Sequence, residues 1–278
     1  MTTLPLVSVI TPSYNQGKYI ETTIKSVLNQ NYPNLEYIII DGGSTDGSLS
    51  IIKKYADKLT YISERDGGQS NAINKGFRIA KGEIVAWLNS DDTYEPGAIS
   101  EAVKYFDQHD VALVYGEGDL INENGQKIKR FEATQSFDLW TLVNVWDYIM
   151  QPTTFFKRNA LEKVGYLDED LHWTMDWDLW IRLAKKYKVG YINKILANSR
   201  EYAETKTSTG GWKRFKEIRT VLRKHGEKRF PPGYFIYAAS TLYTNNAHYQ
   251  LGRFVTSRIL YFIQCHYQRK HLAKNTAV

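Results

Sequence analysis

Residues 83–94, EIVAWLNSDDTY, decide the fold of this chain. The apolar or small residues 84–88 run directly into the polar sequence NSDD, which is typical of a buried strand that ends at a polar edge. Two adjacent carboxylates repel each other there, and burial disfavours the charged form of both. Asp91 and Asp92 therefore indicate a ligand that compensates their charge.

Short strands and helices alternate on both sides of this stretch. We predict strands over 7–11, 35–40, 60–63 and 84–88, and helices over 19–28, 49–55 and 69–80. This alternation predicts an α/β fold with a mainly parallel central sheet flanked by helices. Ligands of such sheets lie outside the carboxyl ends of the strands. Three of these ends carry the polar sequences TPSYN, DGGSTDG and NSDD, which we expect to meet along one edge.

Beyond residue 115 the pattern is less regular. It favours a helix over 137–150, a strand over 151–156, a loop and then a helix over 172–187, and a final strand over 189–195. The last 67 residues are predicted to be helices broken near Pro231 and Pro232.

Composition indicates a globular protein with one large core. Of the 278 residues, 42% are hydrophobic and 24% are charged, as in soluble proteins. Cys265 is the only cysteine, so no disulfide forms within the chain and a reducing compartment fits. A strand begins almost at the N-terminus, and no segment reaches the roughly 20 apolar residues of a membrane-spanning helix. We expect a cytoplasmic protein.

The net charge of +6 is distributed unevenly. Residues 212–278 contain 13 Lys and Arg against two acids, a net charge of +11, so the remainder carries −5. This basic segment could be a solvated helical face or could bind nucleic acid, although it contains no recognised nucleic-acid motif. We favour an anionic membrane surface at the inner face of the plasma membrane, with 211–224 and 252–264 as amphipathic helices.

Asp41 ends the second strand in the sequence DGGSTDGS. The glycines let a ligand approach the backbone closely, and Asp41 could accept a hydrogen bond from a nucleotide base or ribose. The sequence is not GxGxxG, so the dinucleotide-binding fingerprint is absent. Asp46 is better explained as a cap of the next helix.

Asp91 and Asp92 allow two interpretations. Hard cations such as Mg²⁺ and Mn²⁺ take carboxylate oxygens and substrate phosphates as ligands, which matches a carboxylate pair at a strand end. Alternatively, the two acids cap a helix that begins near Pro96.

A second pair of acids lies in MDWDLWIR, at residues 175–182. Asp178 is four residues before Arg182, which predicts an ion pair on a helix surface. Asp176 is either the N-cap of this helix or a general base beside a cleft. A carboxylate at a helix N-terminus is expected to have a lowered pKa.

Taken in chain order, SVITPSYNQ, DGGSTDGS, DGGQSNAINKGF, NSDD, QPTTFF and MDWDLWIRL resemble the family 2 glycosyltransferases over about residues 5–205. The resemblance implies the GT-A fold and an inverting transfer of sugar from a nucleotide sugar. It divides residues 1–211 into a nucleotide-sugar-binding half, 1–115, and an acceptor-binding and catalytic-base half, 116–211. Residues 212–278 form a helical extension.

The resemblance also implies site residues. Those on the nucleotide and donor side are Pro12, Tyr14, Asn15, Asp41, Asp66, Gln69, Lys75 and Asp91. Among them, Asp41 would bind the base, which favours uridine, and Asp91 would contact the ribose or donor sugar. Asp92 would hold Mn²⁺ or Mg²⁺.

Asp176 would be the catalytic base of such an enzyme. Arg200 and Lys206 match a mobile loop that closes over the diphosphate. The acceptor would enter from the side lined by Trp140, Trp146, Gln151 and Trp173. The three tryptophans either stack on acceptor sugars or belong to the core.

Two positions depart from the family's usual motifs. Asn89 replaces the first acid of Asp-x-Asp-Asp, and Met175 replaces the Glu of Glu-Asp. Because Asp92 and Asp176 are kept, we expect an active, metal-dependent hexosyl- or N-acetylhexosaminyl-type transferase that acts on a glycan or lipid-linked acceptor in surface polysaccharide or glycolipid synthesis. The alternatives are a catalytically inactive nucleotide-sugar-binding scaffold and a nucleotidyltransferase. SYNQGKY is a poor phosphate loop for the latter.

Overall fold

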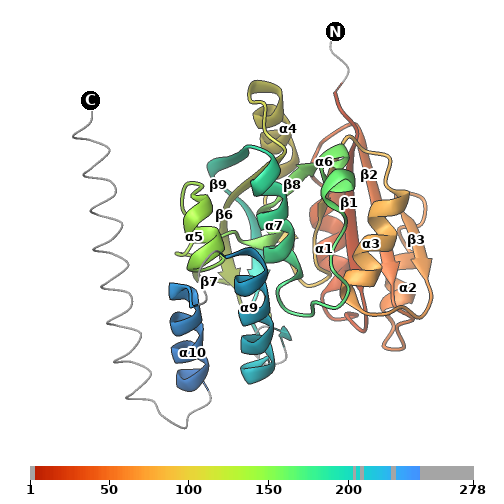
Figure 1. Ribbon diagram of the computed structural model, residues 1–278. Coiled ribbons are helices and arrows are strands. Elements are labelled where there is room, and N and C mark those ends of the chain that lie inside the picture. Colours follow the sequence, from red (N-terminus) through yellow and green to blue (C-terminus); the bar gives the residue numbers. More distant parts are fainter. Residues whose placement is uncertain (1–3, 203–204, 207–209, 227–229, 245–278) are drawn as a thin grey trace.

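The computed structural model describes residues 4–202, 205–206, 210–226 and 230–244 (Figure 1). The strands are β1 (Val7–Ser13), β2 (Leu35–Asp41), β3 (Thr60–Ser63), β4 (Ile84–Trp87), β5 (Thr93–Tyr94), β6 (Leu113–Ile121), β7 (Lys127–Arg130), β8 (Phe155–Lys157) and β9 (Val189–Arg200). The helices are α1 (Ile20–Leu28), α2 (Ser48–Lys53), α3 (Gln69–Ile79), α4 (Ala98–Gln108), α5 (Leu139–Asn144), α6 (Arg158–Val164), α7 (Met175–Lys186), α9 (Gly211–His225) and α10 (Pro232–Thr244), with a 3₁₀ turn, η1 (Gln151–Thr153).

One mixed sheet runs through the molecule in the order β3-β2-β1-β4-β8-β6-β9-β5, with β7 paired to β6. The strands β3, β2, β1 and β4 are parallel to one another, as the sequence predicts. Beyond β4 the sheet is mixed: β8 lies antiparallel to both β4 and β6, whereas β6 and β9 are parallel. The predicted α/β architecture is confirmed.

The register of the parallel strands aligns their polar ends. Ser13 at the end of β1 lies opposite Asp41, and Asp41 lies opposite Ser63. Since β4 pairs Trp87 with Ile10, the sequence NSDD continues past the same edge of the sheet. The polar segments therefore meet along one edge, at the carboxyl ends of β1, β2 and β4.

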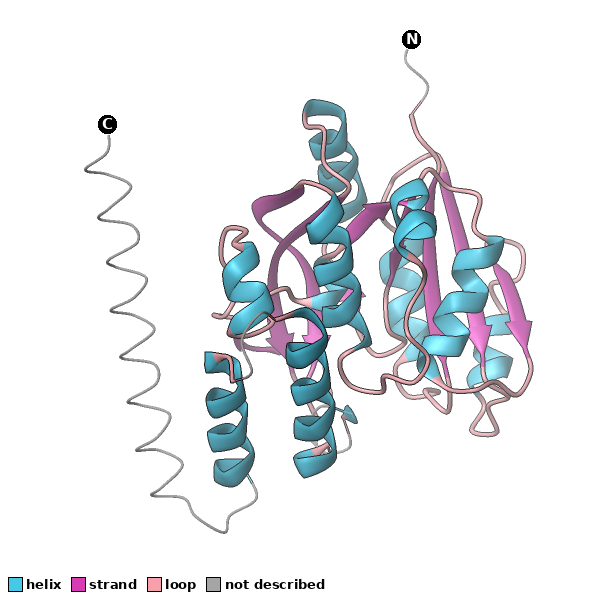
Figure 2. Cartoon of the chain, in the orientation of Figure 1, coloured by secondary structure: helices cyan, strands magenta, loops and turns pink. Residues whose placement is uncertain are grey.

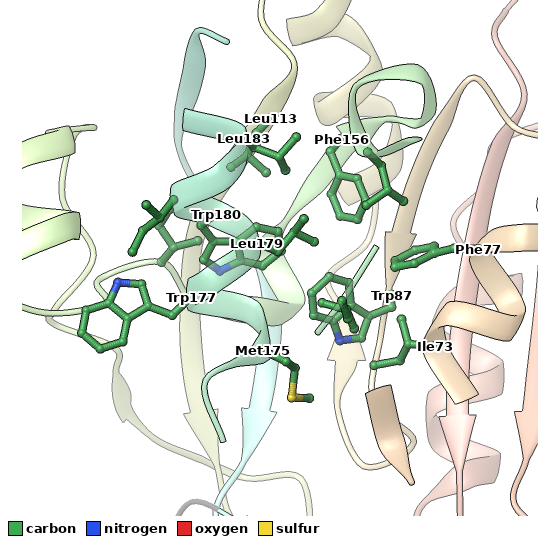
Figure 3. Packing of buried hydrophobic residues seen from close by; sticks show 14 of the residues in the cluster. Ile73, Phe77, Trp87, Leu113, Phe156, Met175, Trp177, Leu179, Trp180 and Leu183 are labelled. Atoms are coloured by element: carbon green, nitrogen blue, oxygen red, sulfur yellow. The ribbon is translucent and has the colours of Figure 1, made fainter. Parts of the chain in front are cut away.

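Both faces of the sheet are covered by apolar side chains. One core cluster joins the sheet to α3 and α7, and another joins it to α1 and α4. In the first cluster Trp87 stacks on Trp180 with ring centroids 5.2 Å apart (Figure 3). A Cβ at Gly76 of α3 would lie 2.4 Å from Ile10, so glycine lets this helix approach β1 closely.

The helix α9 belongs to the same core as α7. It buries Phe215, Ile218, Val221 and Leu222 and packs beside α10, α5 and α7 (Figure 2). After residue 211, α9 ends at His225 and α10 begins at Pro232, close to the break predicted near Pro231 and Pro232. None of the described helices is both long and apolar enough to cross a membrane. The second amphipathic segment, 252–264, lies outside the described residues.

The structure corrects two predicted elements. The helix expected over 137–150 is limited to α5, where the Asp138 carboxylate accepts a hydrogen bond from Thr141 N and Tyr148 turns into the core. The strand expected over 151–156 is η1 followed by β8, because Thr153 Oγ1 donates to the backbone of Met150 and tightens a turn. The long strand β6 gives no alternating pattern, since all nine of its residues are buried.

Candidate active site

The loop after β1 is joined to the loop after β2. Asn15 N donates to Ser44 Oγ at 2.8 Å, and Thr45 N donates to Asn15 Oδ1 at 2.9 Å. Asn15 has a φ of 52°, a left-handed conformation that asparagine tolerates better than most residues. Tyr14 is 64% exposed beside it, while Pro12 is buried within β1. The Tyr14 ring is thus available to a ligand at the sheet edge.

Asp41 is fully buried and organises the loop that follows β2. Its carboxylate accepts hydrogen bonds from the side chains of Ser44 (2.5 Å) and Ser63 (2.7 Å) and from the backbone N of Gly43 and Ser44. Ligand binding by Asp41 remains a prediction, and it would require one of these partners to move.

Asp66 and Lys75 lie at the start and in the middle of the α3 segment. Asp66 Oδ1 accepts from Gly68 N at 2.8 Å, and a Cβ at Gly42 would lie 2.9 Å from Asp66 Oδ2. Glycine at position 42 therefore lets this carboxylate approach the loop after β2. Lys75 forms an ion pair with Glu64 at 2.7 Å.

Asp92 is a buried carboxylate, 3% exposed. It accepts hydrogen bonds from Arg200 N at 2.9 Å and from Asn89 Nδ2 at 3.2 Å. Burial and the adjacent charge of Asp91 raise the pKa of Asp92 to about 8. Burial also raises the pKa of Asp91, whose carboxylate accepts a hydrogen bond from Tyr202 Oη at 2.8 Å.

The chemistry of this carboxylate pair fits a divalent cation. The N-cap of α4 is Gly97, with no side-chain hydrogen bond, so the capping interpretation of Asp91 and Asp92 is wrong. A buried pair of acids whose charged forms disfavour each other is stabilised by a cation. Within the described residues no group of three or more His, Cys, Asp or Glu forms a metal cluster. Only one or two carboxylates of the protein would ligate the cation, as is usual where Mg²⁺ is also held by substrate phosphates.

Asn89 links the two halves of the site. Its Nδ2 donates to Asp92 and to Gln151 Oε1 (3.0 Å), and its Oδ1 accepts from Gln69 Nε2 at 2.8 Å. Gln69 Oε1 in turn accepts from Lys206 Nζ at 2.7 Å. An amide both donates and accepts, which an ionised aspartate at position 89 would not do. The departure from the family motif thus creates a hydrogen-bonded chain from Asp92 to Lys206.

Asp176 is half-buried in the first turn of α7, where it accepts from Trp177 N at 2.8 Å. Burial raises its pKa, against the opposing charges of Lys206 and Arg214, so the lowered pKa expected at a helix N-terminus is wrong. The helix N-cap is Thr174, not Asp176. Burial also lowers the pKa of Lys206 to about 8.

Glu217 of α9 caps α7 from outside, a contact that sequence reasoning missed. Its carboxylate accepts from His172 N (2.8 Å), Trp173 N (2.6 Å), Thr174 N (2.7 Å) and Thr174 Oγ1 (2.8 Å). These bonds satisfy backbone donors at the start of the helix that carries Asp176. Glu217 is one of only two acids in the basic segment, which is the one signal that marked it.

Asp178 forms the predicted ion pair with Arg182 at 2.7 Å, but the pair is not at the surface. Asp178 is 0% exposed and also contacts Lys224 (2.9 Å) and His225 (2.7 Å) of α9. Burial alone would raise its pKa, but the hydrogen bonds from His225, Lys224 and Arg182 hold the pKa of Asp178 well below the ordinary value. This cluster fastens α9 to α7.

Arg200 is 5% exposed at the end of β9. Its guanidinium donates to the backbone oxygens of Asp91, Asn122 and Glu123 and lies 4.8 Å from the centre of the Tyr19 ring. Arg200 is therefore an internal anchor, and of the two predicted loop cations Lys206 is the one whose side chain joins the hydrogen-bonded chain that starts at Asp92.

Two side chains predicted on the acceptor side lie near this chain. Gln151 bonds to Asn89 and donates to Trp87 O at 2.9 Å, and half-buried Trp173 donates from Nε1 to Lys206 O at 3.0 Å. Trp140 and Trp146 are also half-buried, and Trp146 packs against the core cluster.

A cavity of about 810 Å³ opens at the opposite end of the sheet. It lies beside the start of β4 and is lined by Pro5, Tyr32, Lys104 and Arg158 among others. None of the predicted site residues borders it, so the site is defined by its polar side chains and not by this cavity.

Comparison with known proteins places the chain in a family. The profile of "Glycosyl transferase family 2" matches residues 8–165. An uncharacterized glycosyltransferase of Rickettsia typhi is 32% identical over 213 residues, which are 74% of this chain and 67% of that protein. A putative teichuronic acid biosynthesis glycosyltransferase, TuaG of Bacillus subtilis, is 30% identical over 230 residues, 79% of this chain and 88% of that protein.

Solved structures share the fold. TarS 1-349 of S. aureus in complex with UDP-GlcNAc superposes with a TM-score of 0.65 at 19% identity, covering 88% of this chain and 74% of that one. A mannosyltransferase from Pyrobaculum calidifontis in complex with GDP-Man and Mn²⁺ has a TM-score of 0.62 at 22% identity, covering 99% and 81%. The predicted GT-A fold is confirmed, and the chain belongs to glycosyltransferase family 2.

Proposed function

We propose that this glycosyltransferase moves a hexosyl or N-acetylhexosaminyl group from a UDP-sugar to a glycan or lipid-linked acceptor, with inversion at the anomeric carbon. The observation that carries the proposal is the hydrogen-bonded chain of Asp92, Asn89, Gln69 and Lys206, which ends beside Asp176. This chain connects the carboxylate pair Asp91 and Asp92, which would bind the cation of the diphosphate, with Asp176, which would accept a proton. The UDP-GlcNAc complex of TarS supports a uridine donor, and TuaG supports a role in surface polysaccharide or glycolipid synthesis.

The donor would lie across the carboxyl ends of β1, β2 and β4. Tyr14 would pack on the base, while the loop that Asp41 organises, together with Asp66, would face the nucleotide. Asp91, fixed by Tyr202, would contact the ribose or donor sugar. Lys75 would contact the donor only after its ion pair with Glu64 is broken.

Asp92, with Asp91 beside it, would hold Mn²⁺ or Mg²⁺, which neutralises the charge of the leaving diphosphate. The Mn²⁺ in the mannosyltransferase structure supports a cation in this fold. Lys206, with a pKa of about 8, is mostly protonated at neutral pH and adds a second positive charge. The Arg200 backbone N and the Asn89 amide keep the Asp92 carboxylate oriented.

Asp176 would accept the proton of the acceptor hydroxyl. As that oxygen bonds to the anomeric carbon, the bond from this carbon to the diphosphate oxygen breaks and the nucleoside diphosphate leaves. Burial raises the pKa of Asp176, which makes its carboxylate a better proton acceptor than an exposed one. Trp173 would form one wall of the acceptor entrance, held by its bond to Lys206 O.

Localisation at the inner face of the plasma membrane, through an anionic surface, is part of the proposal. The outer face of α9 carries exposed Lys213, Lys216 and Arg223. Trp212 is 46% exposed at its start, and Phe235 of α10 is 47% exposed. Basic residues beside aromatic ones suit the headgroup region of an anionic bilayer. Nucleic acid is not the expected partner.

Turnover of a panel of UDP- and GDP-sugars, with and without Mn²⁺ or Mg²⁺, tests the function. Asp176→Asn and Asp92→Asn are expected to lose at least a hundredfold in transfer, since each removes a charge used in the transition state. Full activity of Asp176→Asn would overturn its role as base, and metal-independent turnover would overturn the role of Asp92. A protein that binds UDP-sugars but transfers none would be the scaffold.

A further inference from the structure

The site contains a carboxylate that no sequence motif marks. Asp147 lies in the loop between α5 and η1, and it is half-buried. The Met175 side chain, seen at the start of α7 in Figure 3, leaves the family's usual Glu position without an acid. Asp147 lies on a different element, whose loop is joined to α7 through Tyr237 and Trp177.

Contacts among three elements place Asp147 beside the start of α7. Asp147 N donates to Tyr237 Oη of α10 at 3.3 Å. The Tyr237 ring lies 5.7 Å from the ring of Trp177, whose backbone N bonds to the Asp176 carboxylate at 2.8 Å. Trp177 Nε1 donates to Leu142 O of α5, which fixes this helix against the loop that carries Asp147.

The negative charge of Asp176 acts on Asp147. Burial and then the negative charge of Asp176 raise the pKa of Asp147, while Arg214 of α9 opposes the shift. Arg214 also opposes the raised pKa of Asp176. The Arg214 guanidinium thus favours the charged form of both acids.

The Asp147 carboxylate keeps acceptor capacity for a ligand. Among the described residues, the only hydrogen bond to it comes from Ile149 N, to Oδ1 at 3.0 Å. A carboxylate can accept about four hydrogen bonds, so Oδ2 can still bind a donor such as a sugar hydroxyl. A structural carboxylate in this protein, by contrast, is fully bonded: Glu217 takes four donors.

We propose that Asp147 is the second carboxylate of the acceptor site and binds a hydroxyl that neighbours the attacking one, in place of the acid that Met175 lacks. This inference rests on the proposed role of Asp176. The attacking hydroxyl gives its proton to Asp176 and bonds to the anomeric carbon; the neighbouring hydroxyl keeps its proton and donates a hydrogen bond to Asp147. The acceptor is accordingly a sugar with two adjacent free hydroxyls, not an isolated alcohol.

The test compares Asp147→Asn with the wild-type chain in two reactions. Both reactions use a UDP- or GDP-sugar that the wild-type chain turns over. Hydrolysis of the donor by water needs no sugar acceptor, and transfer to p-nitrophenyl glycosides does. We expect the KM for the glycoside to rise about tenfold to a hundredfold, the usual effect of losing a hydrogen bond to a charged group, and this loss should exceed any loss in hydrolysis. With the glycoside that lacks the neighbouring hydroxyl, the variant and the wild-type chain should differ little.

Asp138→Asn is the matched control, because Asn also caps α5 and the same chemical change then occurs outside the site. Equal transfer by Asp147→Asn and the wild-type chain would overturn the proposal. So would an equal loss in hydrolysis and transfer, which would indicate a structural role, or no transfer to any glycoside while donor hydrolysis proceeds. Absence of donor turnover in the wild-type chain would instead refute the proposed function itself.

Discussion

Glu217 on α9 and Thr174 at the N-cap of α7 are joined by two hydrogen bonds, from Thr174 N at 2.7 Å and from Thr174 Oγ1 at 2.8 Å. The N-cap side chain makes no capping bond of its own, so a carboxylate from another helix does the capping. The negative charge of Glu217 also interacts favourably with the positive end of the α7 helix dipole. The turn that presents Asp176 is therefore held by a helix beyond the region that the family profile matches.

Glu217→Ala should destabilise the protein by about 2 kcal/mol, because it leaves the partly buried backbone donors of Trp173 and Thr174 without partners. Glu217→Gln should reduce the free energy of unfolding by less than Glu217→Ala does. Three of the four hydrogen bonds end on one carboxylate oxygen, Oε1, which an amide oxygen can replace. Urea denaturation measures the stability, and transfer should fall in the same order. Glu162→Ala, which removes only an exposed ion pair with Arg158, is the control. Equal stability of Glu217→Ala and the control would contradict the capping role.

Asn89→Asp should make the protein depend on a divalent cation for stability. The substitution replaces the amide that donates to Asp92 and Gln151 with a third carboxylate beside Asp91. Without metal we expect a loss of about 1–3 kcal/mol, which Mn²⁺ should largely restore. Thermal melting with EDTA or Mn²⁺ measures this, with the exposed Asn124→Asp as control. A metal-independent melting temperature would refute the prediction.

The metal-free protein should become less stable as the pH rises from about 4 to about 8. Asp92 has an ordinary pKa when unfolded but a pKa of about 8 when folded. Between these values the folded state binds more protons, so the free energy of unfolding falls with pH, by at most about 1.4 kcal/mol per unit from this group.

Asp92→Asn should remove that slope and be more stable than the wild-type chain near the alkaline end, although we expect it to lose at least a hundredfold in transfer. Urea denaturation in EDTA across this pH range provides the measurement. Asp170→Asn, an exposed acid, should keep the slope. A wild-type stability that rises across the range would contradict the raised pKa of Asp92.

Replacing Lys213, Lys216 and Arg223 together by Ala should weaken binding to anionic vesicles. Each basic residue near such a surface contributes about 1 kcal/mol, so we expect a loss of up to a hundredfold. All three side chains are exposed, which predicts an unchanged fold. Flotation with phosphatidylserine-containing and with neutral vesicles measures the effect. Equal flotation of the variant and the wild-type chain, or binding by neither, would exclude α9 as the contact.

The N-terminal elements follow closely from the sequence. The predicted strand 60–63 and helix 69–80 match β3 and α3 within one residue, because a local repeat of apolar residues fixes their period. The helix predicted over 137–150 failed because the apolar run there belongs to a loop whose Tyr148 and Met150 are buried by contacts distant in sequence. Local periodicity does not distinguish a buried loop from a buried helix.

The sequence by itself determined the α/β class, the polar edge and the carboxylates Asp91, Asp92 and Asp176. These depend on residues that are neighbours along one strand or one helical turn. Only the tertiary structure decided that Asn89 joins Asp92 to Gln69, that Glu217 caps α7, and that the loop of Asp147 contacts Tyr237 beside Trp177. Hydrogen bonds and charge interactions act over a few ångströms in space, and the chain separates Glu217 from Thr174 by 43 residues. Packing alone brings such partners together.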